Sequence, residues 1–227
     1  MSLGSMARAA LGKRCFPVVG GWYRAVFVSL ERVVDCLPKL DPGSRVLDIG
    51  GGDGEMINIL LRRDPTLNVT MLDMSPRLGA FLKPQFRAQV HTLPSTSLRD
   101  YAATTYDPPN LVIVSDVIHH VPVEARADFF ADLALVLRRQ ATTLFVKDLE
   151  PGHFRSTLSL LADRHVSGDK KVSLVSREEV VVRVKTAFPG AQVESTKLFE
   201  IDRPNYALTF TIKASRVSNA RPIDVRR

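Results

Sequence analysis

Short apolar runs alternate with helix-length amphipathic stretches along most of the chain, and this alternation constrains the fold more than any other feature. The runs typical of β-strands are residues 45–49, 68–73, 89–93, 111–115 and 142–147. The stretches typical of helices are residues 22–37, 55–63, 76–82 and 124–139. Such alternation favours a parallel sheet with helices on both faces, and strands that are almost wholly apolar fit its buried centre. We therefore predict a doubly wound α/β fold.

The end of the chain departs from this alternation. A helical stretch at 177–188 precedes two predicted strands at 192–199 and 206–213, and only residues 200–205 separate those strands. A parallel crossover needs roughly a dozen residues, so this pair must be antiparallel. The sequence thus predicts a mostly parallel, seven-stranded sheet with a reversed last strand.

Composition and charge limit the kinds of partner. The chain has 227 residues, 45% of them hydrophobic, which suits one globular domain. The net charge of +7 comes from residues 1–24 and 214–227, while residues 25–213 are neutral overall. Because a nucleic-acid surface needs an excess of cations on the folded body, we expect no nucleic-acid partner. We expect a helical lead-in over 1–40, one domain over 41–213 and a basic, disordered tail over 214–227.

The lengths of the apolar runs and the number of cysteines indicate where the protein resides and whether its thiols are free. No apolar run approaches the roughly 20 residues of a membrane span, and no secretory signal is evident. Two cysteines, Cys15 and Cys36, indicate free thiols and neither a disulfide framework nor a metal cluster. These features predict a cytoplasmic protein without a membrane partner.

Glycines cluster where the first predicted strand turns into the first helix. Gly50, Gly52 and Gly54 follow a G-x-G-x-G spacing, and residues without Cβ permit a ligand to approach the backbone closely. Asp48 stands two residues earlier, where a dinucleotide-binding fold has an apolar residue, and its carboxylate suits a cationic ammonium group. Asp73 ends the second strand, 23 residues after Gly50, where a carboxylate can accept both hydroxyls of a ribose.

Residues 46–54 resemble the first motif of class I S-adenosylmethionine (SAM)-dependent methyltransferases, and the likeness extends over about 40–215. It implies SAM as cofactor and S-adenosylhomocysteine as product. The residues that it assigns to the cofactor in this part of the chain are Asp48, Gly50, Gly51 and Gly52 for the methionyl group, and Asp73 and Met74 beside the ribose. The family often has an acid after the third strand for the adenine amino group. Ser95 or Thr96 stands there instead.

The segment after the fourth strand, residues 115–121, resembles that of two groups of small-molecule methyltransferases. In quinone-biosynthesis-type enzymes two histidines lie beside the cofactor, which implies a cofactor role for Ser115, Asp116 and His120. In caffeate-type O-methyltransferases a histidine at the position of His119 is the general base. Asp148, after the fifth strand, is the second catalytic candidate. The alternative is that a histidine caps the next helix or packs against the cofactor without proton transfer.

A metal is not expected. Asp116 and Asp148 resemble two of the three magnesium ligands of catechol O-methyltransferases, but Leu149 occupies the place of the third, an asparagine. We therefore predict metal-independent methyl transfer from SAM to a small-molecule acceptor, with oxygen slightly favoured. An RNA or protein methyltransferase, a nicotinamide-dependent oxidoreductase and a SAM-binding protein without catalysis are the alternatives. The oligomeric state stays open.

Overall fold

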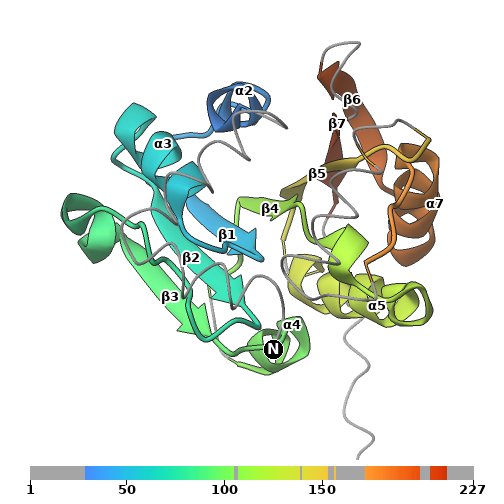
Figure 1. Cartoon of the computed structure of the whole chain (residues 1–227), viewed down its shortest axis with the longest axis horizontal. Coiled ribbons are helices and arrows are strands. Elements are labelled where there is room, and N and C mark those ends of the chain that lie inside the picture. The colour runs from blue at the N-terminus through green and yellow to red at the C-terminus, as the bar shows by residue number, and fades with distance from the viewer. Residues whose placement is uncertain are drawn as a thin grey trace, which may run out of the picture.

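The computed structural model describes residues 29–104, 107–138, 140–152, 156, 172–199 and 205–213. These residues form one seven-stranded sheet in the order β3-β2-β1-β4-β5-β7-β6 (Figure 1). The strands are β1 (Arg45–Ile49), β2 (Asn68–Asp73), β3 (Val90–Pro94), β4 (Leu111–Ser115), β5 (Thr142–Leu149), β6 (Gln192–Phe199) and β7 (Asn205–Ile212). The first five strands pair in parallel, and β7 is antiparallel to both of its neighbours. The predicted sheet with its reversed last strand is confirmed.

Helices cover both faces of this sheet, as the predicted doubly wound architecture requires (Figure 1). On one face α2 (Leu30–Asp35) and α3 (Glu55–Arg63) pack with Val46, whereas α4 (Leu98–Ala103), α5 (Arg126–Leu137) and α7 (Arg177–Ala187) pack with Leu47 on the other. Successive side chains of a strand point to opposite faces, so β1 contributes to both layers of core. None of the described helices is both long and apolar enough to cross a membrane.

The predicted helix over 76–82 is wrong, because this segment forms turns. Two of its backbone donors bind the glycine loop instead of the preceding turn of a helix. The N–H of Gly79 donates to the carbonyl of Gly52 at 2.8 Å, and the N–H of Phe81 donates to that of Asp53 at 2.8 Å. Gly79 has a φ of +68°, which a helix does not allow. The segment therefore braces the loop that follows β1.

The helical elements that were not anticipated include α4, the 3₁₀ helix η1 (Pro84–Gln89) and the 3₁₀ helix η2 (Ile118–His120). α4 begins with a capping box in which Ser97 and Asp100 bind each other's backbone N–H groups. The S-x-x-D pattern was a usable signal for this helix. Of the expected helix over 22–37, the structure describes the part from Ser29, in which α2 ends at Asp35. Residues 22–28 lie outside the described residues.

Not all apolar residues of α5 are buried. Phe130, Leu133, Val136 and Leu137 are buried, but Leu135 is 40% exposed. At about 100° per residue Leu135 points away from Leu133, which faces the sheet, and this direction leaves Leu135 partly exposed.

The loop after β1 depends on the missing side chain of Gly50. A Cβ at Gly50 would lie 2.3 Å from Cγ2 of Val117, and Gly50 has a φ of +72°. Because both the overlap and the left-handed backbone act against a side chain, the loop can meet the segment after β4 only with glycine at this place.

We predict that Gly50→Ala lowers the free energy of unfolding by about 2–4 kcal/mol, from the backbone strain and the overlap together. Gly190→Ala is the matched control, because nothing lies within 4 Å of a Cβ at Gly190. Denaturant unfolding of both variants measures the difference. Equal stability of the two variants would contradict the contact.

Candidate active site

The strand order reverses between β1 and β4, and in open α/β sheets this is where the loops at the carboxyl ends part to leave a binding crevice. A cavity of about 630 Å³ lies at this point. It is lined by residues from the loops after β1, β2, β3 and β4 and from the first turns of α4 and α5. The lining residues are Ile49, Gly50, Leu72, Asp73, Met74, Thr96, Ser97, Leu98, Asp116, Val117, His120, Val121, Ala125, Asp128, Phe129 and Asp132.

Asp73 organises two loops at the edge of this cavity. Its Oδ2 accepts a hydrogen bond from the N–H of Gly52 at 3.0 Å, and its Oδ1 accepts one from the N–H of Ser75 at 2.7 Å. The carboxylate is thereby fixed at the end of β2. Each oxygen retains further acceptor capacity toward a ligand, since an ionised carboxylate offers about four lone-pair sites.

Asp48 is a buried carboxyl. Its side chain lies in β1, the residue is 1% exposed, and its Oδ2 has no hydrogen-bond partner among the residues that the structure describes. Burial and, as a smaller contribution, the nearby Asp73 carboxylate together raise the pKa of this carboxyl from 3.8 to about 8. A group of this kind fits a cationic ligand atom, which would restore its ordinary ionisation.

Six of the predicted cofactor residues line the cavity, namely Gly50, Asp73, Met74, Thr96, Asp116 and His120. The other five do not line it, and they are Asp48, Gly51, Gly52, Ser95 and Ser115. Ser95 shapes the loop after β3 through a φ of +53°, and Asp116 has a similar φ of +57°. Strained backbone of this kind gathers at binding sites.

The part of the cavity wall that α4 and α5 contribute was not predicted from the sequence. Ser97 and Leu98 come from the start of α4, and Asp128, Phe129 and Asp132 come from α5. Asp128 and Asp132 lie one helical turn apart and therefore face the same way. Acids at this spacing on an otherwise apolar helix could have indicated from the sequence that one side of α5 faces the cavity.

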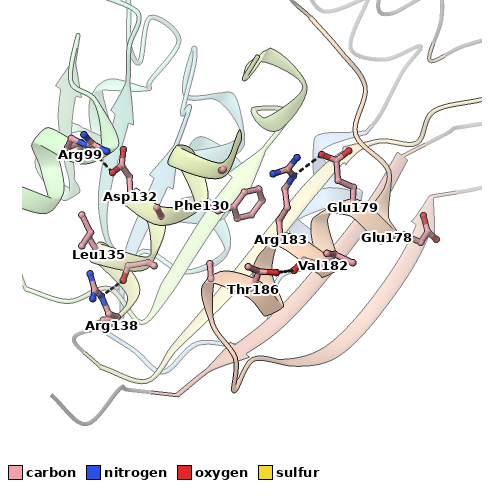
Figure 2. Close-up of a pocket in the computed structure, with 14 residues that line it drawn as sticks. Arg99, Phe130, Asp132, Leu135, Arg138, Glu178, Glu179, Val182, Arg183 and Thr186 are labelled. Carbon is pink, nitrogen blue, oxygen red and sulfur yellow. Dashed lines mark hydrogen bonds and ion pairs between the residues drawn. The ribbon is translucent and has the colours of Figure 1, made fainter. Parts of the chain in front are cut away.

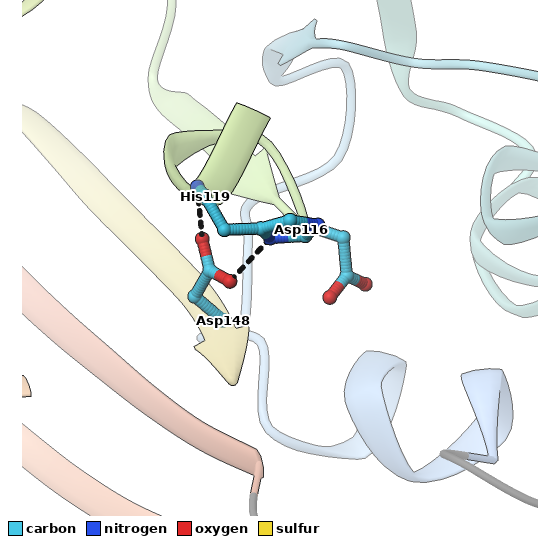
Figure 3. A group of neighbouring side chains, drawn as sticks. All are labelled: Asp116, His119 and Asp148. Atoms are coloured by element: carbon cyan, nitrogen blue, oxygen red, sulfur yellow. Dashed lines mark hydrogen bonds and ion pairs between the residues drawn. The ribbon is translucent and has the colours of Figure 1, made fainter. Parts of the chain in front are cut away.

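The two catalytic candidates form a buried pair across β4 and β5 (Figure 3). Nδ1 of His119 lies 2.6 Å from Oδ1 of Asp148, and the backbone N–H of His119 donates to Oδ2 at 3.2 Å. The two residues are 3% and 0% exposed. Because an ionised carboxylate only accepts hydrogen bonds, Nδ1 carries a proton, and whenever the ring is neutral its lone pair lies on Nε2.

The environment of Asp148 keeps its carboxyl ionised. Burial acts to raise the pKa, but the charge and hydrogen bond of His119, the backbone N–H of Leu149 and the charge of Lys147 outweigh it and lower the pKa. Asp148 therefore serves as a charged acceptor that orients the imidazole ring. His120 lines the cavity, and its ring centroid lies 4.2 Å from that of His119.

Asp116, His119 and Asp148 each offer one possible ligand atom within 4.8 Å of the others. All three residues already have strong partners, since Nζ of Lys147 lies 2.5 Å from Oδ1 of Asp116 and His119 binds Asp148. Lys147 is 2% exposed and supplies a cation within this cluster. The expectation of metal-independent chemistry stays a prediction.

The comparisons with known proteins identify the class. A family model described as a methyltransferase domain matches residues 23–185, which is more than half of the chain. The chain therefore belongs to this family. Its fold and sheet order match those of a solved SAM-dependent methyltransferase, so the family match and the fold agree on this class. No curated protein matches the sequence.

Solved structures share the fold at low identity. An O-methyltransferase family 2 protein from Planctomyces limnophilus, in complex with apigenin, is 18% identical with a TM-score of 0.62, over 82% of this chain and 57% of that one. The mitomycin 7-O-methyltransferase MmcR is 17% identical with a TM-score of 0.62, over 81% and 52%. A SAM-dependent methyltransferase from Archaeoglobus fulgidus is 16% identical with a TM-score of 0.60, over 84% and 98%. The chain thus spans little more than half the length of the first two.

We predict that the ligand-free Asp48→Asn variant becomes more stable than the ligand-free wild type as pH rises. Folding raises the pKa from 3.8 to about 8, so between these values the folded state holds a proton that the unfolded state has lost. The wild type therefore loses stability across this range, by up to about 1.4 kcal/mol per pH unit, and the neutral amide does not. Denaturant unfolding at a series of pH values measures this. Parallel stability curves for the two proteins would show that Asp48 is not a buried, protonated group.

Proposed function

We propose that the protein transfers a methyl group from SAM to a small-molecule acceptor, with a hydroxyl oxygen favoured as the accepting atom. The observation that carries the proposal is the buried pair of His119 and Asp148, which lies beside a cavity lined by Asp73 and His120. The family match favours this reading over a nicotinamide-dependent oxidoreductase.

The residues around the cavity fit SAM. The unpartnered carboxyl of Asp48 suits the methionyl ammonium, and the fixed carboxylate of Asp73 suits the ribose hydroxyls. Met74 is 69% exposed and lines the cavity, so it offers an apolar contact to the adenine ring, with Thr96 nearby as a polar partner. The bound cofactor supplies a methyl group on a positively charged sulfonium, and this group is already activated for transfer.

His119 and Asp148 then remove the proton of the acceptor hydroxyl. Nε2 of His119 accepts the proton of the acceptor hydroxyl, because Nδ1 is committed to Asp148. Asp148 holds the ring in this tautomer and stabilises the imidazolium that forms. A positioned base contributes roughly 10²–10⁴-fold to such a reaction, and the rest comes from orienting the acceptor.

The structural neighbours support an acceptor of small, hydroxyl-bearing type, since one was solved with apigenin and another is a mitomycin 7-O-methyltransferase. Apolar side chains at the cavity agree with this class. Phe129 and Val121 line it, and Val123, between Val121 and Ala125 of the lining, is 52% exposed. An RNA or protein substrate stays an alternative, because the basic ends that would hold it lie outside the described residues.

Calorimetric titration with SAM, S-adenosylhomocysteine and NADH tests the cofactor. We expect both adenosyl ligands to bind and NADH not to bind. Asp73→Ala should weaken SAM binding by about tenfold or more, because it removes a charge-assisted acceptor for the ribose and frees the N–H of Gly52. Asp35→Ala, at the end of α2 and outside the cavity lining, is the matched control and should leave the affinity unchanged. Failure of SAM to bind the folded wild type would overturn the proposal.

Turnover on a panel of phenolic acceptors, with flavones included, tests the base. We expect His119→Ala to lower kcat by roughly 10²–10⁴-fold without changing the affinity for SAM. Asp148→Asn should also lower kcat, because the amide no longer fixes the tautomer. His120→Ala is the comparison, since His120 lines the cavity whereas the neighbouring His119 binds Asp148 through its ring. Normal kcat in His119→Ala would remove this residue from the mechanism.

A further inference from the structure

Arg126, seven residues after His119, is a buried cation at the start of a helix. It is the first residue of α5 and is 1% exposed. Burying a charged group is costly, and the first turn of a helix carries the positive end of the helix dipole, so two local effects act against a cation at this place. Local conflicts of this kind are expected at functional sites.

The guanidinium of Arg126 joins three segments of the chain. Its Nε donates to the carbonyl of Val121 at 3.3 Å, and its Nη2 donates to the carbonyl of Ser173 at 2.5 Å. Its Nη1 donates to both carboxylate oxygens of Glu179 in α7, at 3.1 and 3.2 Å. A rigid, planar fork of donors can reach these acceptors together, whereas a lysine ammonium on a flexible stem is a single point charge.

The backbone of His119 is held at both of its polar groups. Its N–H donates to Oδ2 of Asp148 at 3.2 Å, and its carbonyl accepts from the N–H of Ser173 at 2.9 Å. Arg126 binds the carbonyl of Val121, which lies two residues after His119. It also binds the carbonyl of Ser173 itself. The guanidinium thus fixes Ser173 relative to η2, the short helix that carries the imidazole.

Glu179 supplies the opposite charge from the groove between α5 and α7. Figure 2 shows this groove, a cavity of about 940 Å³, with Glu179 and Arg183 on its α7 side. Nε of Arg183 donates to Oε1 of Glu179 at 2.7 Å. Burial acts to raise the pKa of Glu179, but the hydrogen bonds and charges of Arg183 and Arg126 outweigh it and lower the pKa. The carboxylate is shared by two cations, so the loss of Arg126 would leave it with Arg183 as partner.

The position of the His119 ring matters because a general base must lie within hydrogen-bond reach of the proton that it removes. A misplacement of about 1 Å can lower the rate on the order of 10²-fold. The hydrogen bond from Nδ1 to Asp148 fixes one edge of the ring, and the backbone must be held as well for the opposite edge to stay in place.

We propose that Arg126 is a positioning residue for methyl transfer, which fixes His119 through the carbonyls of Val121 and Ser173. This inference rests on the proposed function, because it assigns Arg126 to the step in which His119 takes the proton of the acceptor.

Proton NMR of the ring N–H groups tests the placement without cofactor or acceptor. The Nδ1 proton of His119 is buried and bound to Asp148, so it should exchange slowly with water and give a downfield resonance that is missing in His119→Ala. We expect this resonance to weaken or disappear in Arg126→Met, because a displaced ring opens the hydrogen bond to water. Arg183→Met is the matched control, since it removes the other partner of Glu179 and should leave the resonance unchanged.

A second substitution separates the geometry of the guanidinium from its charge. Arg126→Lys keeps a cation beside Glu179, so it should fold even if Arg126→Met does not. Its ammonium cannot serve both carbonyls and the carboxylate in the geometry of the fork, and we expect the resonance to be lost in this variant too. Circular dichroism and melting temperatures that match those of Arg183→Met would show that the fold is intact. A resonance of full strength in Arg126→Lys would overturn the positioning role.

A double-mutant cycle tests the same coupling in turnover, with the phenolic acceptor that the wild type methylates fastest. Arg126→Lys should lower kcat roughly tenfold or more in the wild-type background, because the base is misplaced. In the His119→Ala background it should lower kcat by less than about twofold, because the ring that it positions is absent. An equal loss in both backgrounds would assign Arg126 to general stability of the fold and overturn the proposal.

The resonance also separates failure of this proposal from failure of the proposed function. A wild type without the Nδ1 resonance would contradict the buried pair of His119 and Asp148 and overturn both. A resonance that survives in both Arg126 variants would overturn the positioning role alone and leave His119 as the general base.

Discussion

The close approach of the loop after β1 to the segment after β4 is the contact on which the candidate site depends. It exists because Gly50 has no side chain to meet Val117. That approach closes one side of the crevice at the point where the strand order reverses. It also sets the neighbouring glycines where the carboxylate of Asp73 can bind the N–H of Gly52. The catalytic pair lies just beyond, because His119 follows Val117 by two residues.

Three carboxyl groups at the carboxyl edge of the sheet have different environments. Asp148 is buried with an imidazole partner, Asp116 is partly exposed and pairs with the buried ammonium of Lys147, and Oδ2 of Asp48 has no hydrogen-bond partner within the described part of the chain. Burying an unpaired carboxylate is costly, and a raised pKa is the usual relief. The first two groups are therefore balanced within the free protein, whereas in the proposed function a cationic group of the cofactor would balance the third.

Much of this could be predicted from sequence because the relevant patterns are local. The strands were found from apolar runs, and the antiparallel end was found from the short link at 200–205. The helix expected over 76–82 failed because its donors bind the glycine loop, which is a tertiary contact that no local pattern reveals. For the same reason the pairing of His119 with Asp148 was not foreseen, since 29 residues separate them and only the parallel pairing of β4 with β5 brings them together. The cavity wall from α5 was missed because helical periodicity was used to find the core and not the site.

The protonated carboxyl of Asp48 has a consequence for how the interior responds to its ligand. With a pKa of about 8 this group holds a hydrogen ion near neutral pH, and in the proposed binding mode the ammonium group of the cofactor would displace it. Occupation is then an exchange of one positive charge for another, so the net charge enclosed beside β1 is the same before and after. The surrounding sheet need not rearrange to absorb a new charge, and the displaced ion leaves to the solvent, where the buffer takes it up. The heat measured for such an exchange therefore includes the ionisation enthalpy of whichever buffer is present.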